Sequence, residues 1–221
     1  MTVTKEAVSK ALLTGVGAGY LQKVKTEATS SQGLTYDEKT YEVFAIDKVA
    51  FKGQIKEKTV YLSNIKARDI VKFASVEMTV DIGFFPDGFL EEMSGMTKLA
   101  NGVYVQGDSP RYKQFRWSFP VTDEDGKEII YNFPVCQIES PDFNAETETD
   151  EKKENISQVT IKAYPVIGSK NKSVFSKIDL RETDKYDREK LLLQGFYDAE
   201  TLKQCLFERY VNFEFYKTRL Y

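Results

Sequence analysis

The chain has 221 residues, 31 Lys and Arg against 34 Asp and Glu, and enough length to bury a core without disulfide staples. Its net charge of −3 offers no basic excess for gripping phosphate backbones, which disfavours a DNA clamp. Histidine is absent and the two cysteines form no CxxC pair, which argues against His-dependent catalysis, a disulfide framework and a zinc site.

The first 35 residues contain GVGAG at 15–19 and TEATSSQG at 26–33, a composition typical of an N-terminal arm and a flexible connection. GVGAGY lacks the GxGxxG spacing and the lysine of phosphate-binding loops, so we interpret it as a turn. The N-terminus has no uninterrupted apolar segment, and no 18 apolar residues run together anywhere. We therefore expect neither export nor membrane spanning, and synthesis in a cytoplasm.

Residues 40–72 contain apolar clusters and many lysines without a steady helical period. This pattern predicts extended strands with a long hairpin or loop. Its lysines are interleaved with Asp47 and Glu57, so a solvated hairpin and a contact between subunits are both compatible with it.

The segment VEMTVDI at 76–82 alternates apolar with polar residues, which predicts a strand with one buried and one wet face. Glu77 and Asp81 would lie on the wet face, about 13 Å apart, beyond the separation that a glycosidase needs. FPDGFLEEMSG follows, with Pro86 near the start of a predicted short helix and Gly95 at its end.

Two dipeptides predict tight turns, Asn101-Gly102 before a short strand and Asp125-Gly126 within a longer hairpin. The longer hairpin would pair a strand whose alternating residues are Phe115, Trp117, Phe119 and Val121 with a return strand at 129–138. We expect Phe115, Trp117 and Phe119 to be core anchors. DEDG at 123–126 does not match the spacing of a calcium loop, so a hairpin turn is the better interpretation.

Eleven acids against three lysines lie between 121 and 154, which predicts a solvated loop before a strand in QVTIKAYPV at 158–166. The end of the chain predicts a helix in DKYDREKLLLQG and a second helix in DAETLKQCLFERY. A strand in VNFEFYK follows. The apolar face of the second helix would carry Leu202, Cys205, Leu206 and Tyr210. We expect this helix-helix-strand segment to be an appendage to the preceding body.

These elements, with 13 Tyr and 15 Phe, predict an α+β chain, mainly β, with antiparallel strands. No nucleophile, carboxylate pair or phosphate loop forms a credible catalytic constellation. We therefore expect no enzyme activity, no catalytic or metal residues and no cofactor.

The run VEMTVDIGFFPDGFLEEMSGMTKLANGVYVQGDSPRYKQFRWSF, with QVTIKAYPV further on, resembles the major tail protein family of long-tailed, non-contractile bacteriophages. The resemblance covers roughly residues 40–168. It implies an antiparallel β-sandwich of the tail-tube type with a flanking short helix, which we place at 36–183. The arm at 1–35 and the C-terminal extension at 184–221 are departures from the family pattern.

The resemblance also implies a structural virion protein that self-assembles into stacked hexameric rings. These rings would form a tube that conducts DNA into the host. Its implied partners are further copies of itself, the tape measure protein and tail terminator or distal tail proteins, with DNA passing through the lumen without tight binding. The implied inter-subunit loop is 47–72, and its candidate contact residues are Val49, Phe51, Ile55, Tyr61 and Ile65. We expect Glu77 and Asp81 to face the lumen, because they occupy the polar face of the strand at 76–82.

A second interpretation is a baseplate- or receptor-associated β-sandwich that recognises a host saccharide. It would present Trp117, Tyr112 and Tyr104 to the sugar, because aromatic side chains are amphipathic contact surfaces. Alternation along the strand favours core packing of Trp117 over this role.

Overall fold

The computed structural model describes residues 11–62, 65–141 and 157–210, without side chains at 58–62, 65–71 and 140–141. Strands predominate. They are β1 (Leu13–Val16), β2 (Gly19–Thr26), β3 (Thr35–Val43), β4 (Ile46–Leu62), β5 (Ile65–Ile82), β6 (Thr97–Ala100), β7 (Val103–Val105), β8 (Phe115–Asp123), β9 (Glu128–Pro141), β10 (Ser157–Ala163) and β11 (Ser176–Asp179). The helices are short: α1 (Phe89–Met93), α2 (Arg188–Leu193), α3 (Ala199–Leu202) and the 3₁₀ turn η1 (Lys203–Cys205).

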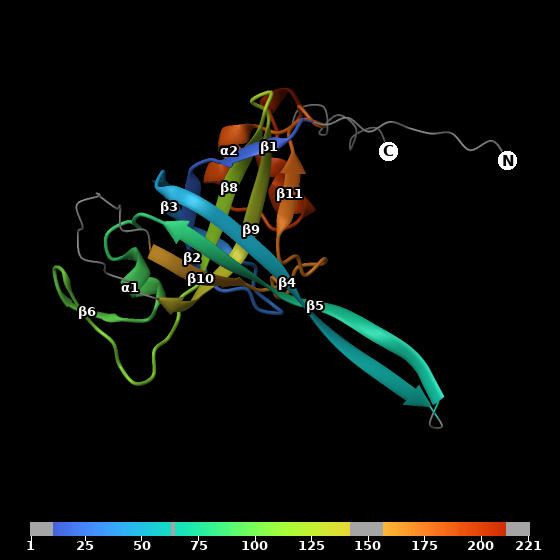
Figure 1. The fold of residues 1–221 in the computed structure, drawn as a ribbon, viewed down its shortest axis with the longest axis horizontal. Coiled ribbons are helices and arrows are strands. Elements are labelled where there is room, and N and C mark those ends of the chain that lie inside the picture. Colours follow the sequence, from blue (N-terminus) through green and yellow to red (C-terminus); the bar gives the residue numbers. More distant parts are fainter. Residues whose placement is uncertain (1–10, 63–64, 142–156, 211–221) are drawn as a thin grey trace, which may run out of the picture.

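One antiparallel sheet contains nine of these strands, in the order β3-β2-β8-β9-β10-β5-β4, with β1 paired to β8 and β11 paired to β9 (Figure 1). The sheet curves around its own core. The ring of Phe51 on β4 lies 5.5 Å from the rings of Tyr131 and Phe133 on β9, although β5 and β10 separate these strands in the sheet. The prediction of a mainly β, antiparallel α+β fold is therefore confirmed.

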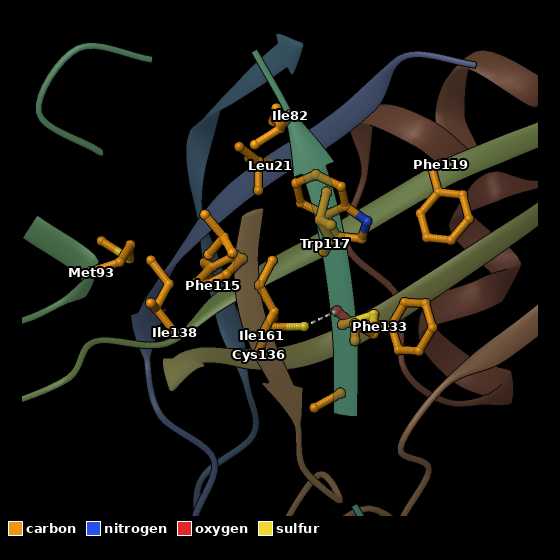
Figure 2. Packing of buried hydrophobic residues seen from close by; sticks show 14 of the residues in the cluster. Leu21, Ile82, Met93, Phe115, Trp117, Phe119, Phe133, Cys136, Ile138 and Ile161 are labelled. Carbon is orange, nitrogen blue, oxygen red and sulfur yellow. Dashed lines mark hydrogen bonds between the residues drawn. The ribbon is translucent and has the colours of Figure 1, made fainter. Parts of the chain in front are cut away.

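The main core occupies the concave face of this sheet (Figure 2). The predicted alternation in β5 is confirmed: Val76, Met78, Val80 and Ile82 are fully buried, whereas the residues between them are half-buried. Phe115, Trp117 and Phe119 of β8 are buried in the same core, which extends through β9 and β10. Burial of large apolar side chains is the main favourable contribution to folding.

The opposite face of β8 is buried as well, because the C-terminal segment covers it. Leu191 and Leu192 of α2 pack with Tyr20, Ile130 and Ile178 in a second cluster. The expected appendage is therefore wrong for the described residues up to 210: α2 is part of the body (Figure 1). Sequence reasoning missed this because the β8 residues that face α2 are polar.

The N-terminal segment also differs from the expected arm. Strand β2 lies inside the sheet between β3 and β8, with Leu21 fully buried, and β1 pairs with β8. The small residues serve close packing here: a Cβ on Gly19 would lie 2.6 Å from Ile46 and 3.2 Å from the Trp117 ring. The expectation of an arm over 1–35 is thus wrong for Leu13–Thr26, while residues 1–10 lie outside the described chain.

The second C-terminal helix is shorter than its periodicity indicates. Helix α3 and η1 end at Cys205, and Leu206 is extended, with φ −70° and ψ 150°, and bridges to Tyr186. Leu206 therefore leaves the predicted helical face, because its backbone pairs with another segment. The predicted strand at 211–217 and most of the predicted acidic loop, 142–156, lie outside the described residues.

The segment between β5 and β8 follows the sequence prediction closely. Helix α1 begins after Pro86, and Gly95 follows its C-cap with φ 77°. Asn101-Gly102 forms the turn between β6 and β7, with Gly102 at φ 74°. Only β6, the first strand of this small hairpin, was not predicted.

Candidate assembly surface

The hairpin β4–β5 is much longer than the sheet that supports it. Its register runs from Ile46 opposite Ile82 to Leu62 opposite Ile65, whereas β10 supports β5 only from Val76 to Ile82. Eight residues of β4, Ile55–Leu62, thus pair with a part of β5 that lies beyond its pairing with β10. At about 3.3 Å per residue this part extends roughly 26 Å beyond the body, and Figure 1 shows it projecting as a two-stranded ribbon.

An isolated two-stranded ribbon is marginally stable in water, and its open edges can pair with another chain. At its base, Ile55 and Phe73 lie directly opposite each other and are 57% and 40% exposed. Apolar side chains left in solvent on a ribbon with open edges are typical of a surface that another molecule covers. The ribbon, residues 55–73, is therefore a candidate interface.

The predicted contact residues divide between the body and the ribbon. Val49 packs against the main core, and Phe51 contacts the aromatic rings of β9, so both help to anchor the hairpin in its own chain. Ile55 is exposed on the ribbon. Tyr61 and Ile65 lie near its tip, and their side chains are outside the described ones.

One face of the ribbon has a basic character. Lys56 lies directly opposite Lys72, and both are exposed. Towards the tip the backbone register continues with Lys58 opposite Ile70 and Val60 opposite Arg68. Like charges directly opposite each other destabilise a strand pair. An acidic partner would remove this repulsion.

Glu77 and Asp81 lie on the outer face of β5, half-buried, and each has a basic or amide neighbour on both sides. Glu77 is between Lys52 of β4 and Lys162 of β10, and its Oε2 accepts a 3.4 Å hydrogen bond from Gln54 Nε2. Asp81 is between Lys48 and Gln158, whose Nε2 donates to its Oδ1 at 2.8 Å. The two carboxylates therefore belong to a mixed-charge face.

Lys162 makes an ion pair on that face. Its Nζ lies 3.0 Å from Glu139 Oε1, and this hydrogen bond raises the pKa of Lys162. Three lysines, at 48, 52 and 162, thus stand among three carboxylates, at 77, 81 and 139. A surface of this kind has little net charge and little attraction for a phosphate backbone.

A cleft of about 620 Å³ lies at the end of β5 that is opposite to the ribbon tip. Its walls come from α1, the β6–β7 hairpin and the ends of β5 and β10, and its charged lining residues are Asp87, Glu91 and Lys98. Exposed apolar side chains lie in its wall or on the adjacent hairpin: Phe84, Leu99, Val103 and Val105. Sequence reasoning did not identify this site, although the apolar residues Leu99, Val103 and Val105 on either side of the Asn101-Gly102 turn were a signal.

Ion pairs fix the cleft wall made by α1. Glu92 pairs with Lys23 of β2 and, at 2.9 Å, with Lys113. Burial acts to raise the pKa of Glu92, but the hydrogen bonds from the two lysines lower it below its usual value. The carboxylate therefore stays charged at neutral pH and ties α1 to the sheet.

The described residues hold no group of three or more acidic or cysteine side chains arranged to bind a metal ion. Trp117, one of the proposed sugar-binding aromatics, is fully buried. Among the helices in the described ranges, none is both long and apolar enough to cross a membrane. Comparison of the chain with models of protein families and with curated proteins gave no match.

Proposed function

We propose that this chain is a structural, self-assembling subunit of the phage tail-tube kind, which forms stacked hexameric rings and a conduit for DNA. The observation that carries the proposal is the ribbon 55–73, which leaves the body with open edges and exposed apolar residues. A neighbouring subunit would cover these groups, and closure into a ring would remove exposed edges that otherwise invite aggregation.

The charge of the molecule supports a conduit rather than a DNA clamp. The chain has a net charge of −3, and the face around Glu77 and Asp81 has balanced charges. If this face lines the lumen, DNA would slide past it without the counterion release that drives tight binding. The proposed location is the virion tail, with tape measure, terminator and distal tail proteins as further partners.

The ribbon can be tested by replacing two apolar residues at its base with the double variant Ile55→Ser and Phe73→Ser. The matched control is Ile167→Ser, which changes a loop residue of similar exposure, 61% against 57% for Ile55. Sedimentation velocity across a concentration series and negative-stain microscopy would follow assembly, and far-ultraviolet circular dichroism would confirm folding.

We expect the unaltered chain and the control to form rings or tubes as concentration rises, and the double variant to remain monomeric. A wild-type chain that stays monomeric at every concentration would contradict the proposed function. Normal assembly by the double variant would show that the ribbon base is not the contact surface.

The saccharide-binding alternative loses its main aromatic residue. Trp117 is buried in the core, and the Tyr104 hydroxyl packs against the backbone of Gly88, so only Tyr112 offers substantial exposed area. Sugar recognition by aromatic stacking needs exposed ring faces, and these three residues do not present them together.

A further inference from the structure

The turn between β6 and β7 carries the only Asn-Gly dipeptide of the sequence, Asn101-Gly102. Both residues are exposed. A Cβ added at Gly102 would meet no heavy atom from another part of the chain within 4 Å. The side chain of Asn101 and the peptide bond that follows it therefore lie in open solvent.

An asparagine in such a place can react with its own backbone. The backbone nitrogen of the next residue attacks the side-chain amide carbon and closes a succinimide ring. This reaction needs a following residue without a bulky side chain, a backbone that can rotate into the ring-forming geometry, and access for water. Glycine meets the first condition, because it has no Cβ and adopts a wide range of backbone angles.

The small hairpin around the turn meets the second condition. In the described chain, β6 and β7 pair only with each other, in a two-stranded sheet separate from the main one. A two-stranded hairpin is marginally stable in water, so its turn opens locally at little cost in free energy. Leu99 and Val103, on either side of the turn, are 67% and 48% exposed and add little packing that would hold it closed.

Two other asparagines of the described chain lack one of these conditions. Asn132 is fully buried, its Oδ1 accepts a hydrogen bond from Arg116, and its Nδ2 donates to a backbone carbonyl, so its side chain is held in place. Asn171 is exposed like Asn101, but it precedes Lys172, whose side chain hinders ring closure. The remaining asparagines lie outside the described residues, and each precedes alanine or a larger apolar residue.

We propose that Asn101 is a site of spontaneous deamidation in the folded protein. The bond from the Gly102 nitrogen to Asn101 Cγ forms, the bond from Cγ to Nδ2 breaks, and Nδ2 leaves as ammonia with the proton of the Gly102 amide. Water then opens the succinimide at one of its two carbonyl carbons, which gives aspartate or isoaspartate. The reaction consumes only water, and the product has one more carboxylate. This inference does not depend on the proposed function.

The new carboxylate would lie in the wall of the cleft, which Asn101 lines together with Asp87, Glu91 and Lys98. Two carboxylates and one ammonium group would thus become three carboxylates and one ammonium group. Isoaspartate would also lengthen the backbone of the turn by one methylene group. Deamidation therefore changes both the charge of the cleft and the shape of the hairpin beside it.

Peptide mapping of the aged full-length protein tests the inference. Mass spectrometry would follow the replacement of the amide NH₂ by OH at each asparagine, and an isoaspartyl methyltransferase would detect isoaspartate. The reference is the same chain unfolded in urea, and Asn171 is the internal control. The matched variant is Gly102→Ala, which adds a Cβ in open space and leaves Asn101 unchanged.

We expect Asn101 to convert in the folded chain, and Gly102→Ala to slow this conversion by about tenfold, which corresponds to about 1.4 kcal/mol of activation free energy. Asn171 should convert more slowly than Asn101. An Asn101 that stays intact in the folded chain while the unfolded chain converts would overturn the inference. Equal rates for Asn101 and Asn171, or for Asn101 with and without Gly102→Ala, would also overturn it.

Discussion

Arg116 is the most informative single residue for stability. It is fully buried on β8, and no carboxylate is among its hydrogen-bond acceptors. Its guanidinium donates to Asn132 Oδ1 at 2.7 Å, to the Leu191 carbonyl at 2.7 Å and to the Leu192 carbonyl at 3.0 Å. The last two groups belong to the final turn of α2, where carbonyls lack partners within the helix and the helix dipole favours a cation.

We predict that Arg116→Met lowers the free energy of unfolding by about 2–5 kcal/mol. A fourth, longer hydrogen bond goes to Gln22 Oε1 at 3.4 Å. The three shorter charge-assisted hydrogen bonds contribute roughly 1.5–3 kcal/mol each, and their loss leaves buried acceptors unsatisfied. The substitution also has an opposing, stabilising effect, because it removes the free-energy cost of burying a charge. Burial lowers the pKa of Arg116 from its usual 12.5 to about 10, which corresponds to roughly 3 kcal/mol. The hydrogen bonds outweigh this relief.

Urea unfolding of the variant, at a concentration where the chain is monomeric, measures this difference. The control is Arg111→Met at an exposed position, where a change within about 0.5 kcal/mol is expected. Arg116→Lys should also destabilise, since one ammonium cannot reproduce the planar fork of donors. A loss below about 1 kcal/mol for Arg116→Met would refute the view that this side chain attaches α2 to the sheet.

Two further predictions concern alkaline pH and one glycine. Burial raises the pKa of Cys205 to about 11 from 9, so its contribution is present below pH 9 and is lost as pH rises toward 11. Urea unfolding between pH 8 and 10.5 measures this effect. Over that range the free energy of unfolding should fall less for Cys205→Ala than for the wild type, by up to about 2 kcal/mol. Parallel plots of unfolding free energy against pH for the two proteins would contradict this. Gly95→Ala should lower the free energy of unfolding by roughly 2–4 kcal/mol. Its added Cβ would lie 2.7 Å from the Arg111 backbone, and an alanine is also strained at the φ of 77° that Gly95 adopts. Gly102→Ala, at φ 74° in open space, should cost only about 1 kcal/mol, and equal thermal shifts for the two variants would show that the clash does not matter.

The sequence predicts best the elements whose signals are local. Alternation in β5 and β8, the Asp-Gly and Asn-Gly turns and the boundaries of α1 depend on neighbouring residues, and the structure contains all of them. Strand β2 was missed because the residues two positions before and after its core residue Leu21, on the same face, are Gly19 and Lys23. Its place in the sheet therefore depends on pairing with β3 and β8. The buried role of Arg116 depends on a helix that begins 72 residues later, which no local pattern encodes.

The candidate interface could be predicted only in part for the same reason. The apolar clusters and lysines at 40–72 indicate a long hairpin, but the sequence does not say where its supporting strand β10 ends. Likewise, the cleft brings Asp87 and Lys98 together from two elements separated by a turn, and sequence spacing does not show a hollow between them. The loop contact is an expectation from the resemblance, whereas the exposure of Ile55 and Phe73 at the ribbon base comes from the geometry.

The point where the ribbon leaves the body is fixed by packing rather than by the turn at its tip. The register shifts between Gln54 and Ile55, and such a bulge bends a strand and increases its twist. Just before it, a Cβ on Gly53 would lie 2.5 Å from the Phe73 ring, so glycine allows that ring to lie against β4. Phe51, two residues before Gly53, contacts the aromatic rings of β9. The direction of the ribbon is therefore set before any partner binds, which reduces the conformational entropy that assembly must overcome.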